Sequence, residues 1–254
     1  MCAGPVIRQT GPMTLTHRQL WRIYNQNTRA VEAVLDQSCA LAKDDIRKGG
    51  DTKQGQNRVA ALLLAAFMEA KLNEILVYPN AIPETSRKEL LKESIVDRWT
   101  KLIELGFEQR MDSRYSKSSP RTLTFEDKAR RAELLRIVAD YVDPLVQSRN
   151  RIAHGQWKVA LTTEGDQVSQ SRTDTIYQYT VWRVILQKNL LIHFTTLVHN
   201  LVVTRNAHDR DFDLHFRNLE SAEGRMMYPR AERNWVTMIE KRHARRPKLS
   251  STNK

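Results

Sequence analysis

Cysteine is nearly absent from this chain of 254 residues. Its two cysteines, Cys2 and Cys39, lie far apart, and neither belongs to a C-x-x-C pair. This usage indicates neither a disulfide framework nor a zinc knuckle. We therefore expect a protein of the cytoplasm, where thiols stay reduced, with no cofactor and no metal held by cysteine.

Long apolar runs are also missing. The first residues, MCAGPVIRQTGPM, lack the apolar stretch of a signal peptide. The two most apolar segments, residues 59–70 and 190–203, are shorter than the roughly 20 residues that a bilayer-spanning helix needs. We find no internal repeat. The sequence therefore predicts no membrane partner and no repeat architecture.

Acidic residues are scarce relative to basic ones. Lys and Arg number 41 against 29 Asp and Glu, a formal charge of +12, and 27 of the 41 are arginine. The guanidinium group presents a planar set of donors that fits phosphate. A polyanion, RNA or DNA, is therefore the expected partner. The alternative is a basic protein whose charge serves only solubility.

The apolar residues recur at helical spacing. Leu20, Tyr24, Val31 and Leu35 open a stripe that continues to Ile46 and predicts a helix from Thr14 to the glycines at 49–50. The same reasoning predicts helices over residues 59–76, from Thr85 or Ser86 to Gly106, from Thr124 to His154 with a kink at Pro144, and over 183–204. The predicted fold is all-α, an up-and-down bundle of about five long helices.

The period changes after Gly155. The segments QWKVALTT and DTIYQYTVW, on either side of a polar stretch, predict a small β-hairpin inserted over about residues 156–181. We divide the chain into a flexible leader (1–12), a helical bundle (13–206) and a basic C-terminal extension (207–254) that is partly helical.

The stretch LVQSRNRIAHGQW, residues 145–157, starts as an apolar helix and ends in polar residues beside a glycine. At about 100° per helical residue, Asn150 and His154 project from nearly the same face, and Arg149 flanks them. Gly155 suits the left-handed position that follows a helix. The pattern predicts a helix that ends at His154 and presents an arginine, an asparagine and a histidine.

These residue types suit chemistry on a phosphodiester. Histidine exchanges protons near neutral pH and acts as a general acid or base. Arg149 beside it could hold a phosphate and stabilise the charge that develops there. Asn150 could orient the imidazole or the phosphate. The alternative is structural: His154 complements the helix dipole, and Arg149 pairs with a glutamate of the bundle.

The segment RNRIAH, Arg149 to His154, resembles the R-[N/H/D]-x-x-x-H motif of HEPN ribonucleases, and the likeness extends over roughly residues 50–205. The resemblance implies a helical bundle whose homodimer brings two motifs together. The composite site would cut RNA without metal and leave a cyclic phosphate, with Arg149, Asn150 and His154 as the site residues. Many such proteins are toxins or antiviral-defence effectors, a role compatible with an antitoxin or other regulatory partner.

A second match, RDFDLH, runs from Arg210 to His215. It follows a charged stretch, and no apolar helix leads into it, so we interpret it as a solvated surface segment. Glu69 interrupts the apolar second helix, where a carboxylate needs a cationic partner. It is a candidate for orienting Arg149 or His154, unless it simply lies at a helix edge.

Other histidines have simpler explanations. His193 and His199 stand among apolar residues, and we expect core histidines bonded to backbone carbonyls. A metal site could be sought in a cluster of His and Asp, but no second ligand cluster accompanies it, so we predict none. That cluster consists of His208, Asp209, Asp211, Asp213 and His215.

The C-terminal residues 225–254 hold nine Lys and Arg against two Glu, a net charge of +7. Such a run predicts RNA-backbone contacts that weaken with salt, or else a solubilising end. Trp235 and Tyr228 could stack on bases. Together with Arg151 in the motif, the candidate RNA-binding residues are Arg242, Arg245, Arg246 and Lys248.

The sequence therefore favours a metal-independent endoribonuclease that acts as a homodimer. A non-catalytic HEPN-like module that binds nucleotide or nucleic acid, or serves as an assembly partner, is the alternative from another class. A DNA-binding regulator ranks third, since no helix-turn-helix spacing is found.

Overall fold

A computed structural model of the chain describes residues 15–48, 53–79, 81–114 and 122–244, so the predicted leader lies outside the described residues. Within these ranges the chain is almost wholly helical, and the all-α prediction is confirmed. The helices are α1 (His17–Lys48), α2 (Lys53–Leu76), α3 (Glu84–Leu90), α4 (Ile95–Arg114), α5 (Phe125–Ile137), the π-helical turn η1 (Val138–Val142), α6 (Asp143–Ala153), α7 (Gln170–Tyr177), α8 (Val181–Val202), α9 (Arg205–Met226) and α10 (Pro229–Ala244).

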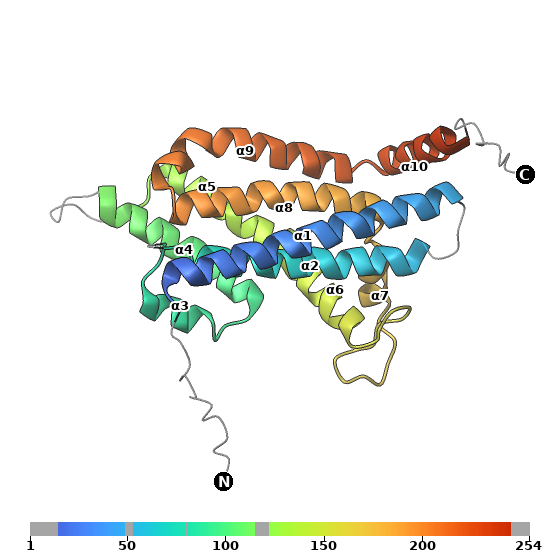
Figure 1. Cartoon of the computed structure of the whole chain (residues 1–254), viewed down its shortest axis with the longest axis horizontal. Coiled ribbons are helices and arrows are strands. Elements are labelled where there is room, and N and C mark those ends of the chain that lie inside the picture. Colours follow the sequence, from blue (N-terminus) through green and yellow to red (C-terminus); the bar gives the residue numbers. More distant parts are fainter. Residues whose placement is uncertain (1–14, 49–52, 80, 115–121, 245–254) are drawn as a thin grey trace, which may run out of the picture.

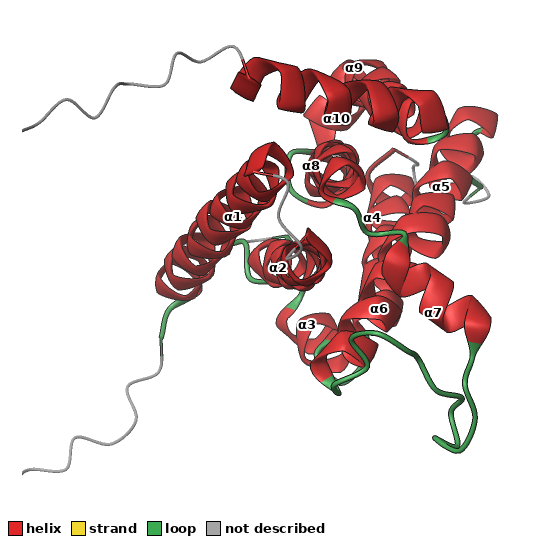
Figure 2. Ribbon diagram, turned by 90° about the vertical axis from the view of Figure 1, so that its right-hand side faces the viewer, coloured by secondary structure: helices red, strands yellow, loops and turns green. Residues whose placement is uncertain are grey.

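Helix α8 is the central element of the bundle. It is apolar on nearly every face, packs along α9, and contacts α1, α2, α4 and α5 (Figures 1 and 2). Phe194 packs against Trp99 of α4, with ring centroids 5.2 Å apart. None of the helices within the described ranges is both long and apolar enough to cross a membrane.

The predicted helix that runs to Gly106 is two helices. A turn at residues 91–94 separates α3 from α4, and Ser94 caps α4 by accepting a hydrogen bond from the backbone N–H of Asp97 at 3.1 Å. Gly106 does not end α4 but lies inside it. A Cβ at this position would come within 2.7 Å of Leu201 Cγ, so glycine allows α4 and α8 to approach closely.

The predicted β-hairpin is wrong. Residues 156–169 form a loop with one isolated antiparallel bridge between Leu161 and Val168, and the second predicted strand is α7 followed by the start of α8. The β-branched residues of this segment follow a helical spacing, since Thr173 and Ile176 are buried on one face of α7. Tertiary burial of that face outweighs their preference for strands.

Helix α5 begins at Thr124, whose side chain accepts the Asp127 backbone N–H, as the sequence predicts. The following π-helical turn precedes Pro144, which has no N–H to donate and crowds the carbonyl four residues earlier. Arg136 and Tyr141 both donate to Glu223 of α9, Tyr141 at 2.6 Å. These bonds fasten the element that carries α6 to the rest of the bundle.

Residues 210–215, interpreted as a solvated surface segment, belong to α9, which packs on α8: Arg210, Asp213 and Leu214 are exposed, whereas Phe212 is buried. His208, one turn earlier on the same helix, is also buried. His208 and Phe212 lie four positions apart, so they share one helical face.

Helix α10 follows α9, and its Trp235 packs against Trp182 of α8, with ring centroids 5.1 Å apart. Trp235 is therefore a packing residue of the bundle.

Candidate functional site

One face of α2 contacts the end of α6 and the last residues of α7. Arg58, Leu62 and Glu69 follow this face at helical spacing. Glu69 contacts Arg149 of α6, and the Arg58 guanidinium lies over the ring of Tyr177 of α7, 4.9 Å from its centroid. Leu62 packs against a small core formed by Ile152, Ala160 and Ile176. The RNRIAH segment is thus held on a rigid support.

Arg149 is half-buried and forms an ion pair with Glu69. Its Nη2 lies 3.2 Å from Glu69 Oε2, and 30% of its side chain is exposed. The Nε of Arg149 is buried without a hydrogen-bond partner. Glu69 therefore has the cationic partner that its position requires, while Arg149 keeps an unused donor. Whether this contact orients Arg149 for chemistry stays a prediction.

His154 lies where α6 ends. It is the C-cap residue, its backbone N–H donates to Asn150 O at 3.0 Å, and Gly155 follows with φ +83°. The side chains of Asn150 and His154 are exposed. Within the described part of a single chain, no hydrogen bond or ion pair joins the side chains of Arg149, Asn150 and His154. The motif is accessible, but one chain does not assemble it into a closed site.

Arg151, a predicted RNA contact, lies close to a second arginine. Its Nη2 donates to Gln147 Oε1 at 3.0 Å. Burial lowers the pKa of Arg151, and the positive charge of Arg172 lowers it further. Arg172, on α7, donates to the carbonyl oxygen of Leu161 and to Thr163 Oγ1. Asp143 offsets part of the repulsion between Arg151 and Arg172, but neither guanidinium group forms an ion pair with a described carboxylate, so the two form a potential phosphate-binding site.

Tyr179 interacts electrostatically with both Arg151 and Arg183 but does not neutralise them. The side chain is buried, and burial raises the pKa of Tyr179 to about 12 although both arginines oppose the shift. The phenol is therefore uncharged at neutral pH. Arg183 itself forms no ion pair with any described carboxylate.

Sequence reasoning missed three of these arginines. We give the name α6–α7 arginine group to four arginines on α2, α6, α7 and α8 that lie around the α6–α7 segment and form no ion pair with a described carboxylate: Arg58, Arg151, Arg172 and Arg183. A signal was present in the sequence, because none of the four has Asp or Glu three or four positions away. Arginines on a helix usually find their carboxylates at those distances.

The remaining predicted RNA contacts lie elsewhere. Arg242 belongs to α10, and Arg245, Arg246 and Lys248 lie outside the described residues. Tyr228 is exposed just before α10. These positions therefore give no geometric support to an RNA-binding tail.

The other histidines do not bond to backbone carbonyls in the way we expected. His199 meets the ring of Tyr78 edge-on at 5.3 Å. His193 contacts His215 of α9, the histidine of the second motif match, with the two Nδ1 atoms 3.1 Å apart. In that match Arg210 pairs with its neighbour Asp211. Among the described residues, no three His, Cys, Asp or Glu side chains are grouped to hold a metal ion.

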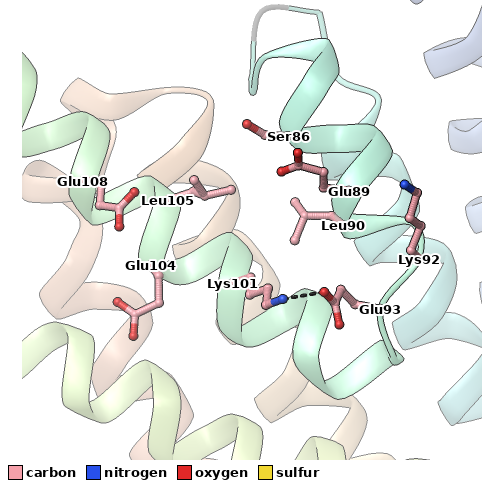
Figure 3. A pocket seen from close by; sticks show the side chains of 9 residues that line it. All are labelled: Ser86, Glu89, Leu90, Lys92, Glu93, Lys101, Glu104, Leu105 and Glu108. Atoms are coloured by element: carbon pink, nitrogen blue, oxygen red, sulfur yellow. Dashed lines mark hydrogen bonds and ion pairs between the residues drawn. The ribbon is translucent and has the colours of Figure 1, made fainter.

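A separate cavity of about 430 Å³ lies between α3 and α4, away from the motif. Figure 3 shows its acidic lining, which includes Glu89, Glu104 and Glu108, and the bond between Lys101 and Glu93. A surface with this excess of carboxylates repels phosphate. The cavity is therefore no candidate for binding a nucleic acid.

Comparisons of the chain with protein-family models, curated proteins and solved structures find no match.

Proposed function

We propose that the protein is a metal-independent endoribonuclease of the HEPN kind, which cleaves RNA at a site formed by Arg149, Asn150 and His154. The observation that carries the proposal is the setting of this motif. An exposed histidine ends α6 three residues after Arg151, and neither Arg151 nor its neighbour Arg172 forms an ion pair with a described carboxylate. A phosphodiester chain would supply the negative charge that these arginines lack.

In the proposed reaction, the imidazole of one His154 takes the proton of the RNA 2′-hydroxyl. The 2′-oxygen attacks the adjacent phosphorus, the bond to the 5′-oxygen breaks, and that oxygen receives a proton. The products are a 2′,3′-cyclic phosphate and a 5′-hydroxyl end. Arg149 would contact the non-bridging phosphate oxygens and stabilise their developing charge, and Asn150 would hold the phosphate or the imidazole in place.

A homodimer would complete this site. Cleavage needs one group to accept a proton and another to donate one, and two facing His154 side chains could serve both purposes. The loop after His154 exposes apolar side chains that a second protomer could cover: Trp157, Val159 and Val168. A Trp157→Glu, Val159→Glu variant is expected to be monomeric in analytical ultracentrifugation and to lose cleavage.

The direct test is cleavage of total tRNA in the presence of EDTA, followed by analysis of the product ends. Cyclic phosphates are expected, and RNA with 2′-deoxy substitutions should resist cleavage. His154→Ala should lower turnover by roughly 10²–10⁴, the usual contribution of general acid–base catalysis, while RNA binding persists. His17→Ala is the matched control, because His17 is an exposed histidine on α1 that pairs with Glu84. Cleavage by His154→Ala at the parental rate would refute the assignment.

The Glu69–Arg149 ion pair favours one alternative. An arginine already paired within its own chain is less available to a phosphate, as in a non-catalytic HEPN-like module that binds nucleotide or nucleic acid or assembles with a partner. Expression in cells separates the two functions. The enzyme should arrest growth and His154→Ala should relieve the arrest, whereas the module should be harmless in both forms.

A further inference from the structure

The closest approach between two histidine rings in the described chain joins α8 to α9. Nδ1 of His193 and Nδ1 of His215 are 3.1 Å apart, with ring centroids at 5.4 Å and planes inclined by 41°. The centroid distance is about the nitrogen separation plus the two ring radii, so the two Nδ1 atoms face each other across the gap between the helices. Neither histidine belongs to the RNRIAH segment.

We propose that His193 and His215 chelate one transition-metal ion, with Zn²⁺ as the expected ligand. A zinc–imidazole bond is about 2.0–2.1 Å long, so two nitrogen atoms 3.1 Å apart subtend roughly 100° at the ion, between octahedral and tetrahedral angles. Neutral imidazole suits zinc, nickel and copper, and hard ions such as Mg²⁺ prefer oxygen. The nitrogen spacing suits this class of ion, and each ring must turn by roughly 40° from its present direction to aim its Nδ1 at the ion.

The pair is accessible from solvent. Both histidines are only partly buried, and exposed residues lie one helical turn away, Asn189 on α8 and Asn218 on α9. Asp211 lies one turn before His215, but its carboxylate accepts two hydrogen bonds from Arg210, each at 2.7 Å. Since the described residues contain no group of three metal ligands, the ion has two protein ligands and water in its other positions.

Such an ion would cross-link α8 to α9. The proposal rests on no part of the proposed nuclease function. Without the ion, the two rings share one proton in an N–H···N hydrogen bond, and the metal replaces that proton. Binding to the folded chain alone raises its thermal stability by mass action.

The test is titration of the tag-free, full-length protein with ZnCl₂, followed by calorimetry. We expect one Zn²⁺ per chain, no binding of MgCl₂, and a zinc-dependent rise in Tm. His193→Gln and His215→Gln should each weaken binding at least about tenfold and remove the rise in Tm. His154→Gln and His17→Gln are the controls, and they should bind as the parent does.

Copper gives a second readout that does not depend on stability. The electron paramagnetic resonance spectrum of the parent with Cu²⁺ should show coupling to two imidazole nitrogens, and each single variant should show one. Unchanged Zn²⁺ stoichiometry and affinity in both variants, or no binding by the parent, would overturn the proposal and leave a proton-sharing histidine pair.

Discussion

Two groups of arginines in this molecule have opposite surroundings. In the α4–α9 cluster, Arg110 and Arg130 both contact Asp209, and Arg110 also bonds to the buried Asp127 at 3.2 Å. In the α6–α7 arginine group, no described member has an ion pair. Charges that are matched inside the bundle hold helices together, whereas the unmatched and partly exposed guanidinium groups of Arg151, Arg172 and Arg183 remain available to an outside anion. We therefore assign the arginines of the α4–α9 cluster to the stability of the fold, and we consider those of the α6–α7 arginine group candidates for binding an anion.

The largest stability effect is expected in the α4–α9 cluster. Arg110→Met should lower the free energy of unfolding by about 3–5 kcal/mol, because the buried carboxylate of Asp127 and the carboxylate of Asp209 each lose an ion pair with Arg110. Urea denaturation measures the change. Arg131→Met is the control, since its ion pair with Glu104 is half-exposed, and it should cost at most about 1 kcal/mol. Equal losses in the two variants would contradict the distinction.

The folded protein should become less stable in acid because of His208, which is buried next to the α4–α9 cluster. Burial lowers the pKa of His208 from 6.5 to about 4, and the charges of Arg110 and Arg130 add to the shift. Below pH 6.5 the unfolded chain gains a proton that the folded chain does not, so stability falls as the pH drops from 6.5 to 4. The loss should reach about 3 kcal/mol.

His208→Leu isolates this contribution. Carboxylates titrate in both proteins, so only the difference between their stability curves reports on His208. Chemical denaturation at several pH values should give a shallower decline for the variant between pH 6.5 and 4. Parallel curves would show that His208 takes up its proton equally in the folded and unfolded states.

Substitutions in the α6–α7 arginine group should weaken the binding of RNA and leave the stability of the fold nearly unchanged. Arg151→Gln combined with Arg172→Gln should change the free energy of unfolding by about 0.5 kcal/mol or less. If each arginine contacts one phosphate of single-stranded RNA, the slope of log K against log salt should fall by about 1.4. Fluorescence anisotropy at several salt concentrations measures the slope.

Two arginines of α9 provide the matched control for that double variant. Arg217 and Arg225 are exposed, and their Nε atoms donate to backbone carbonyl oxygens. Their double glutamine variant removes the same charge and should leave most of the RNA affinity intact. If both double variants lost RNA affinity equally, RNA binding would depend on the net positive charge of the protein and not on a site at Arg151 and Arg172.

A variant of Arg58 compares the two regions directly, and it should have only a small effect on stability. Arg58 is as buried as Arg110, yet its described contacts are Gln54 at 3.5 Å and the ring of Tyr177. Arg58→Met leaves no carboxylate without its cation, so unfolding should change by less than about 1 kcal/mol. A loss as large as that of Arg110→Met would show that both regions depend on their arginines for stability.

Local features of the fold were predictable because they depend on neighbours in the chain. The stripe of α1, the Thr124 cap and the end of α6 before Gly155 all follow from contacts within a few residues. The strand prediction for residues 174–182 failed because the burial of Ile176 against α2 and α6 depends on distant segments. The turn at residues 91–94, which separates α3 from α4, was also missed, because the hydrophobic pattern of the predicted helix continues through it.

The candidate site divides in the same way. The sequence alone placed Arg149, Asn150 and His154 at a helix end, since helical geometry and a glycine are enough to do so. It also identified Glu69 as a carboxylate in need of a cation. The contact between His193 and His215 could not be predicted, because it joins two helices whose relative position follows from the packing of the bundle.

The sequence by itself determined that the chain is helical, basic and able to present an arginine and a histidine where α6 ends, because these properties follow from composition and local periodicity. Only the tertiary structure decided which charges are matched. A guanidinium finds its carboxylate across helices that lie far apart in the chain, as Arg110 does with Asp209. Only the folded arrangement leaves Arg151 and Arg172 near each other without one.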